Sequence, residues 1–400
     1  MSRRPLTAIL LVSLGHLSLE VFHQYLPVIY PLLRDKFDLS FAQLGAVALV
    51  ATTASSIAQP FFGYFTDRWD ARRVVAFSVL WLGLVMGLVG LANSYGLLLG
   101  IVALASLGSA AFHPAGAAVV SKATQGLKGL AVSFFSVGGN LGSAVSPLLM
   151  AAGLAAFGLS GTAVLVPLAL LAGGLLYFGL GREDAGEQAR HRQSQADAGQ
   201  GFVAGLVLLT LAVMTRSWFQ MSLTSYLPVW LEGQGRSVAD AAQMLFLLSV
   251  CIGLGSLAGG TLSDRVGCWQ VLIVCLALLS PLYWLYLNSN GGVQAGFLAG
   301  IGFCLGCTFP TAVVLAQEVW PRGLALASGL VMGLALASGL VMGLGWWPGG
   351  LGASVTGLLA DRIGLDAALS WLLVAPVLGA LCMAAFVVAQ RQTVPVRSRE

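Results

Sequence analysis

The sequence predicts an all-α membrane protein that crosses the bilayer many times, and composition and patterning carry this prediction. Of its 400 residues, 58% are hydrophobic and only 9% are charged, whereas soluble domains carry about 25% charged residues. Apolar runs close to the roughly 20 residues that cross a bilayer as a helix recur along the chain. A membrane β-barrel would instead show alternating segments of about 10 residues.

The apolar runs predict twelve transmembrane helices in two pseudo-symmetric halves of six. The first run is too long for a signal-peptide core and lacks a small-residue cleavage site, so it counts as a span. The predicted spans lie at 6–33, 41–65, 74–92, 96–121, 129–155, 161–180, 202–230, 241–262, 270–288, 293–319, 334–360 and 367–389. A charged stretch between the sixth and seventh spans divides the chain into a half at 1–180, a cytoplasmic linker at 181–201 and a half at 202–400.

The basic residues predict the orientation, because Lys and Arg concentrate in cytoplasmic loops. With the N-terminus inside, fifteen basic residues fall in inside loops and termini, and only Arg34, Lys36, Arg236 and Arg362 fall outside. The one left over, Arg216, lies within a span. Both termini are therefore predicted to be cytoplasmic, and such dispersed charge gives no sign of nucleic-acid binding.

Short repeats relate the two halves. YLPVIY at 25–30 corresponds to YLPVWL at 226–231, and GYFTDRWDARR at 63–73 corresponds to GGTLSDRVG at 259–267. A third copy, GLLADRIG at 357–364, falls on the outer side in this topology. Two parallel halves with a site at their interface are a known transporter plan. The chain has neither a G-x-S-x-G nor an H-E-x-x-H motif, so it is predicted not to be an enzyme.

The loop after the second span resembles the signature loop of the major facilitator superfamily, which acts as a conformational latch. The residues that carry the resemblance are Gly63, Asp67, Arg68, Arg72 and Arg73, echoed by Gly260, Asp264 and Arg265. In such loops Gly allows close helix packing and Asp can meet a helix N-terminus. Asp70 departs from this pattern, since it stands where the family usually has Gly.

Further motifs resemble the fosmidomycin-resistance type of bacterial efflux transporter. They are GSAAFHPAGA at 108–117, VGGNLGSAVSPLL at 137–149, RSW at 216–218, FPTAVVLAQEVWP at 309–321 and ASGLVMGLGWWPGGLGASVTGLLAD at 337–361. The resemblance implies a bacterial inner-membrane antiporter that exports small antibacterial compounds in exchange for protons and thereby confers antibiotic resistance. It implies no cofactor, and we expect a monomer. The acid that the family often carries after His-Pro is replaced here by Ala115 and Gly116.

Ionisable residues inside spans are candidates for transport, because a charge at mid-membrane costs about 2.5–3.5 kcal/mol and needs a cavity or a partner. His16, Glu20 and His23, with Gln24 beside them, share one face of the first helix. Other candidates are Arg216 and Gln220 in the seventh span, His113 before a helix-bending proline in the fourth, and Asn140 in the fifth.

We predict that Glu20 exchanges the proton, modulated by His16 and His23, and that Arg216 binds an anionic group of the substrate or holds the empty site. Burial favours a neutral Glu20 and a nearby guanidinium favours its carboxylate, and the sequence leaves this balance open. A structural Glu20–Arg216 pair is the alternative. Two further functions stay open: a divalent metal-ion carrier using His16, Glu20 and His23, and an uptake symporter for organic anions. No resident metal is predicted.

The segment LALASGLVMG occurs at 324–333 and again at 334–343. From Leu324 to Ala360 a continuous helix would be about 55 Å long, which exceeds a bilayer core of about 30 Å. The first copy is therefore predicted to be surplus to the span.

Overall fold

The computed structural model describes residues 3–66, 69–123, 128–180, 203–319 and 345–393. Within these ranges every regular element is a helix and none is a strand, which confirms the all-α prediction. The linker at 181–201, both copies of the duplicated segment, and Asp67 and Arg68 of the predicted latch lie outside the described residues.

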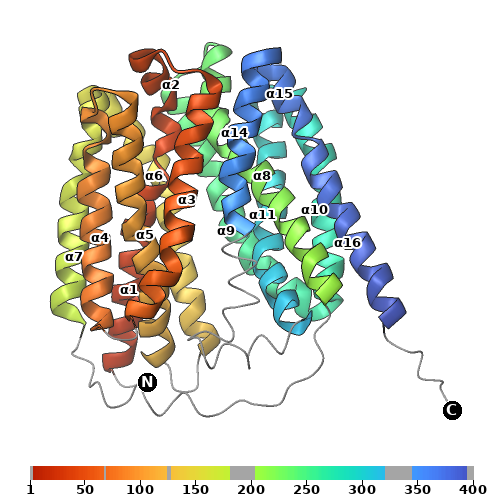
Figure 1. Cartoon of the computed structure of the whole chain (residues 1–400), viewed down its shortest axis with the longest axis horizontal. Coiled ribbons are helices and arrows are strands. Elements are labelled where there is room, and N and C mark those ends of the chain that lie inside the picture. The colour runs from red at the N-terminus through yellow and green to blue at the C-terminus, as the bar shows by residue number, and fades with distance from the viewer. Residues whose placement is uncertain (1–2, 67–68, 124–127, 181–202, 320–344, 394–400) are drawn as a thin grey trace.

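The helices form two groups that stand side by side in Figure 1. The first group contains α1 (Arg3–His23), α2 (Leu26–Phe37), α3 (Phe41–Thr66), α4 (Ala71–Gly87), α5 (Tyr95–Ala123), α6 (Lys128–Phe157) and α7 (Val166–Gly179), with 3-10 helices η1 (Val89–Leu91) and η2 (Gly158–Leu165). The second contains α8 (Val203–Gly233), α9 (Val238–Val266), α10 (Cys268–Leu287), α11 (Gly291–Val319), α14 (Gly345–Ile363), α15 (Leu365–Trp371) and α16 (Val374–Thr393). Both views show long, roughly parallel helices with the drawn chain ends at one end of the molecule.

Breaks divide the first and the last predicted span into two α-helices each, and hydropathy alone does not reveal them. The span predicted at 6–33 is two helices, α1 and α2, with Pro27 in the first turn of α2. Proline lacks an N–H and is best accommodated at a helix start. The last predicted span is likewise divided into α15 and α16.

Length and composition make ten described stretches capable of crossing a membrane. One of them, Phe134–Gly179, contains both α6 and α7, and α14 lies outside the ten. Large apolar side chains such as Leu171, Phe178 and Leu381 are exposed on the outside of the bundle, as expected for a lipid-facing surface. The chain is a multi-pass membrane protein, although the described residues do not fix the count at twelve.

The two groups meet through α3 against α14, α6 against α9, and α2 against α8. Small residues allow the α3–α14 approach. A Cβ atom added to Gly45 would lie 2.7 Å from the carbonyl oxygen of Ala353, and one added to Gly350 would lie 2.9 Å from that of Ala48. These separations are too short for any larger residue without a shift of the backbone.

A carboxylate joins the two groups at the end opposite the termini. Asp361, near the end of α14, accepts hydrogen bonds from the backbone N–H groups of Phe41, at 2.8 Å, and Ala42, at 3.0 Å. The Tyr226 hydroxyl on α8 contacts the Phe41 carbonyl oxygen at 2.9 Å. A negative charge at a helix N-terminus is favourable, because the first N–H groups have no partner within the helix. The third D-R copy in the sequence therefore fastens α14 to the start of α3.

Candidate functional site

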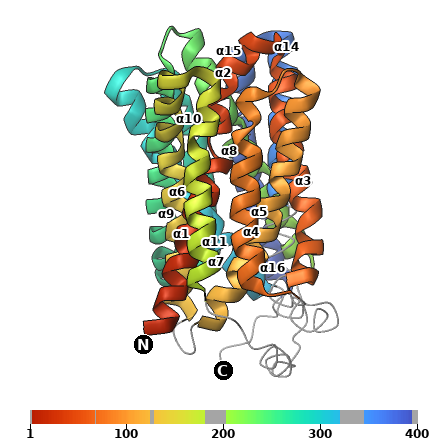
Figure 2. The same cartoon turned by 90° about the vertical axis from the view of Figure 1, so that its left-hand side faces the viewer.

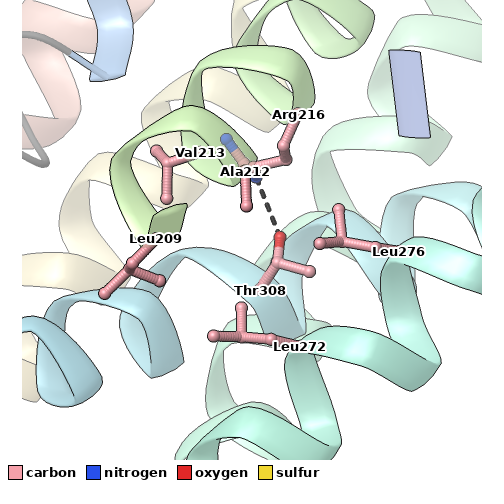
Figure 3. Close-up of a pocket in the computed structure, with 7 residues that line it drawn as sticks. All are labelled: Leu209, Ala212, Val213, Arg216, Leu272, Leu276 and Thr308. Carbon is pink, nitrogen blue, oxygen red and sulfur yellow. Dashed lines mark hydrogen bonds between the residues drawn. The ribbon is translucent and has the colours of Figure 1, made fainter. Parts of the chain in front are cut away.

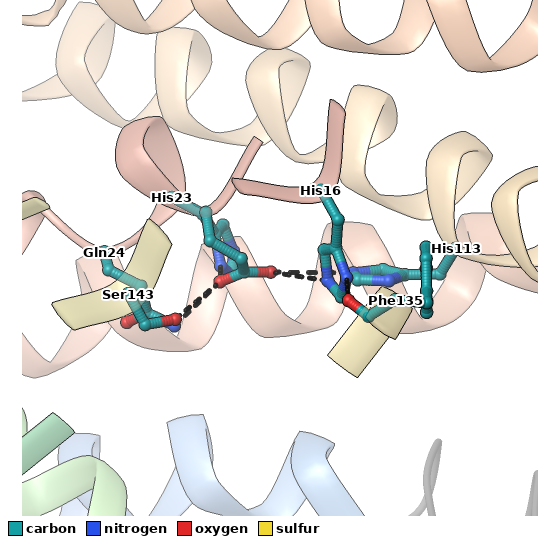
Figure 4. A network of polar contacts seen from close by, with 7 residues as sticks. His16, His23, Gln24, His113, Phe135 and Ser143 are labelled. Carbon is teal, nitrogen blue, oxygen red and sulfur yellow. Dashed lines mark hydrogen bonds and ion pairs between the residues drawn. The ribbon is translucent and has the colours of Figure 1, made fainter. Parts of the chain in front are cut away.

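Glu20 lies at the centre of a buried polar cluster in the first group of helices, and Figure 4 labels the residues around it. Its side chain approaches three imidazoles: Oε1 is 3.7 Å from His16 Nε2 and 3.9 Å from His113 Nε2, and Oε2 is 3.9 Å from His23 Nδ1. Glu20 is only 8% exposed. Among the described residues, no Lys or Arg lies within 4.0 Å of its carboxylate.

Two neutral groups complete the surroundings of the carboxylate. Gln24 Nε2 donates a hydrogen bond to Oε2 over 3.1 Å, and Ser143 Oγ donates to the same oxygen over 3.3 Å. The predicted stripe on α1 is thus present, and His113 from α5 and Ser143 from α6 join it. Ser143 is not among the site residues predicted from the sequence, where its segment, 137–149, contributes only Asn140.

Glycines on α6 bring that helix close enough to α1 for this cluster to form. A Cβ atom added to Gly138 would lie 2.2 Å from the Ser13 carbonyl oxygen, and one added to Gly142 would lie 2.2 Å from the Leu17 carbonyl oxygen. At Gly142 it would also lie 2.9 Å from Glu20 Cβ. The glycine-rich motif at 137–149 therefore has a direct structural role at the acid.

His16 is held in a fixed orientation. Its Nδ1 lies 2.8 Å from the Phe135 carbonyl oxygen, and its ring stacks on the Phe135 ring with centroids 4.2 Å apart. When Nδ1 carries the hydrogen and donates to the carbonyl, Nε2 is left to face Glu20. The rings of His16 and His113 are 5.3 Å apart, so the cluster is continuous from α1 to α5.

The same cluster has ligand types suited to a divalent cation. One nitrogen each from His16 and His113 and one Glu20 oxygen lie within 4.8 Å of one another. Imidazole nitrogen and carboxylate oxygen are common ligands of zinc and related metals. The sequence suggests His16, Glu20 and His23 as a metal-binding set, whereas in the structure His113 rather than His23 lies with the ligand atoms of His16 and Glu20.

Arg216 occupies a second polar centre, in the other group of helices (Figure 3). It lies on α8 and is 2% exposed. Its Nε donates to Thr308 Oγ1 over 2.8 Å and Nη2 donates to the Leu305 carbonyl oxygen over 3.0 Å. Both partners belong to α11. The pairing of Arg216 with Glu20 considered from the sequence is not among the ion pairs of the described residues.

The other predicted site residues are dispersed. Gln220 lies one turn beyond Arg216, and its Oε1 is buried without a hydrogen-bond partner among the described residues. Asn140 faces α9, where an added Cβ at Gly253 would lie 3.4 Å from Asn140 Cβ. Asn140 therefore contacts the second group, whereas its glycine neighbours face α1.

The described part of the predicted latch forms local contacts. Asp70 caps α4 by accepting from the backbone N–H of Arg72 at 3.1 Å, and its Oδ2 lies 3.6 Å from Arg73 Nε. Arg72 also donates to the Leu180 carbonyl oxygen over 3.2 Å. Asp70 thus has a role as a helix cap where the family usually has Gly.

The remaining latch residues differ from the expectation in one respect. Gly63 lies within α3, and Asp264 and Arg265 are exposed near the end of α9. Close packing was expected at Gly260, but an added Cβ there would meet nothing within 4 Å. The close approach occurs one residue earlier, at Gly259, where an added Cβ would lie 2.6 Å from Cys307 Cα.

Comparison with known proteins gives matches over nearly the whole chain. The family model described as Major Facilitator Superfamily matches residues 12–335. The Fosmidomycin resistance protein of Escherichia coli (strain K12) is 30% identical over 384 residues, which cover 92% of this chain and 90% of that protein. The Uncharacterized MFS-type transporter YfnC of Bacillus subtilis (strain 168) is 30% identical over 386 residues, with coverage of 93% and 91%.

A solved structure agrees in fold. The bacterial homologue of the human lysosomal transporter Spinster, in an inward-facing and unoccupied conformation, superposes with a TM-score of 0.76 at 16% identity. The match covers 98% of both chains. At this identity the likeness concerns the fold alone.

Proposed function

Because the chain belongs to the Major Facilitator Superfamily, we propose that it exports small anionic or amphiphilic antibacterial compounds in exchange for protons. The observation that carries the proposal is the buried Glu20 carboxylate, which is surrounded by imidazoles and has no Lys or Arg within 4.0 Å among the described residues. Such a group can change charge during a transport cycle, because no fixed positive charge holds it ionised. The name of the Escherichia coli relative supports export of an antibacterial compound.

Proton binding at Glu20 would act on the packing of three helices. The carboxylate attracts His16 on α1 and His113 on α5 when these imidazoles are protonated, and it accepts a hydrogen bond from Ser143 on α6. A proton on Glu20 removes the negative charge and weakens these contacts together. Pro114 follows His113 within α5, and proline removes one backbone hydrogen bond from a helix. This part of α5 is therefore suited to bend when the charge changes.

We further propose that the protein acts as a monomer in the bacterial inner membrane with both termini in the cytoplasm. The excess of basic residues in the loops on that side supports this orientation. In this orientation, the contact between Asp361 and the start of α3 closes the outer end of the molecule. The Glu20 cluster then exchanges protons with the cytoplasm while that end is closed.

Transport driven by a pH gradient in proteoliposomes tests the proposal, with phosphonates, other antibiotics and metal ions as substrates. Glu20→Gln keeps the size of the side chain and removes its charge, so we expect proton-driven export to be lost. Glu232→Gln is the matched control, because Glu232 is an exposed acid near the end of α8. Full proton-driven export by the Glu20→Gln protein would refute the proposal.

A divalent metal-ion carrier is the second candidate, favoured by the closeness of the His16, Glu20 and His113 ligand atoms. In that case Zn²⁺ or Co²⁺ would raise the unfolding temperature of the wild type and not of His113→Gln, and the metal would be transported. The direction of flow relative to the imposed pH gradient separates export from uptake of organic anions.

A further inference from the structure

Arg216 is a buried cation without an acidic partner among the described residues. No carboxylate of the described residues lies within 4.0 Å of its guanidinium. Residues 320–344, which lie outside the described part and follow α11, contain no Asp or Glu. An arginine stays protonated in proteins, and an uncompensated buried charge is strongly unfavourable. A counter-charge from another source would offset this cost.

The guanidinium also has unused hydrogen-bond donors. Nε and Nη2 each donate one bond, to Thr308 and to Leu305, but Nη1 is buried without a partner among the described residues. The face of the Phe309 ring lies near the guanidinium, with the ring centroid 5.5 Å from Cζ. A ring face offsets only part of the cost of burying a cation. The free donors at Nη1 are therefore the polar feature of this site that still needs an acceptor.

A small pocket adjoins Arg216. It is formed by α8, α10 and α11, and its lining, drawn in Figure 3, consists of Leu209, Ala212, Val213, Arg216, Leu272, Leu276 and Thr308. Apart from Arg216 and Thr308, these side chains are aliphatic. The pocket has room for about one water-sized sphere. This space is too small for an organic substrate, and it suits only a very small acceptor.

We propose that this pocket binds a small inorganic monoanion of the chloride type against the Arg216 guanidinium. The anion accepts hydrogen bonds from Nη1 and neutralises the buried charge, while the aliphatic walls exclude larger anions. The site is separate from the Glu20 cluster, since it lies among helices of the other group. It therefore does not depend on the proposed proton exchange or on the identity of the exported compound.

Thermal unfolding of the purified full-length protein at constant ionic strength tests the anion site. Chloride or bromide is titrated in place of gluconate, which is too large for the pocket. We expect a saturable rise of about 2 °C or more in the unfolding midpoint, because a ligand that binds only the folded state stabilises it. The rise should be absent in Arg216→Gln and retained in Arg236→Gln, which removes an arginine at the loop after α8.

A second variant and a second measurement keep the test valid if Arg216→Gln fails to fold. Ala212→Val fills the pocket without changing any charge, so it should lose the chloride response. Broadening of the chloride NMR signal by the wild-type protein, reversed by added bromide, reports binding without unfolding. An equal midpoint in chloride and gluconate for the wild type would overturn the proposal, as would an unchanged chloride response in Ala212→Val. The first of these outcomes would leave water as the partner of Nη1.

Discussion

Replacing Asp361 by Asn is expected to loosen the contact between α14 and α3 at the end of the molecule opposite the termini. The Asp361 carboxylate accepts hydrogen bonds from Phe41 and Ala42 at the start of α3, at 2.8 and 3.0 Å. Loss of a helix-capping side chain costs about 0.5–2 kcal/mol, and an exposed charge at a helix N-terminus contributes about 0.3–1 kcal/mol. Because Asp361 is exposed and Asn keeps one acceptor oxygen, we take about 1 kcal/mol, or about a fivefold shift between closed and open forms.

Distances between spin labels at this end measure the shift. Ser94 and Gln234 are exposed positions in the loops before α5 and after α8, one in each group of helices. In a background without native cysteines, Asp361→Asn should increase the population with the longer distance about fivefold. Asp366→Asn is the matched control, because Asp366 accepts a 2.7 Å hydrogen bond from Trp230 within the second group. An unchanged distribution in Asp361→Asn, or an equal change in Asp366→Asn, would refute the reasoning.

Two further predictions concern packing and the duplicated segment. Gly142→Ala should destabilise the protein by about 1–3 kcal/mol, because the added Cβ would lie 2.2 Å from the Leu17 carbonyl oxygen. Gly174→Ala, where nothing lies within 4 Å, should leave the unfolding midpoint unchanged, and equal effects of both would contradict this account. Deleting residues 324–333 should leave folding and export intact in proteoliposomes, since the span predicted from the sequence starts with the second copy at residue 334; an unfolded product would show that the first copy is required.

The sequence predicts the features that depend on local spacing. The helical class follows from the apolar runs, and the stripe of His16, Glu20 and His23 follows from the helical repeat. The entry of His113 into the cluster depends on how α5 packs on α1, and spacing along one helix holds no information about the rotation of its neighbour. The same reason applies to Arg216, whose direction toward α11 is decided by the orientation of α8. Pro27 marks the break between α1 and α2 in the sequence, but a hydropathy average over a long window changes little with one residue.

The two polar centres also bear on how proton binding could reach the interface between the groups. An ion pair between Glu20 and Arg216 is one of the alternatives that the sequence suggests, yet the partners of each residue lie within its own group of helices. Helix α6, by contrast, contacts both sides: Ser143 donates to Glu20, and Asn140 packs near Gly253 on α9. A change of charge at Glu20 that moves α6 must therefore change its packing against α9. For the proposed proton exchange, this favours α6 rather than a Glu20–Arg216 pair as the connection between the acid and the relative motion of the two groups.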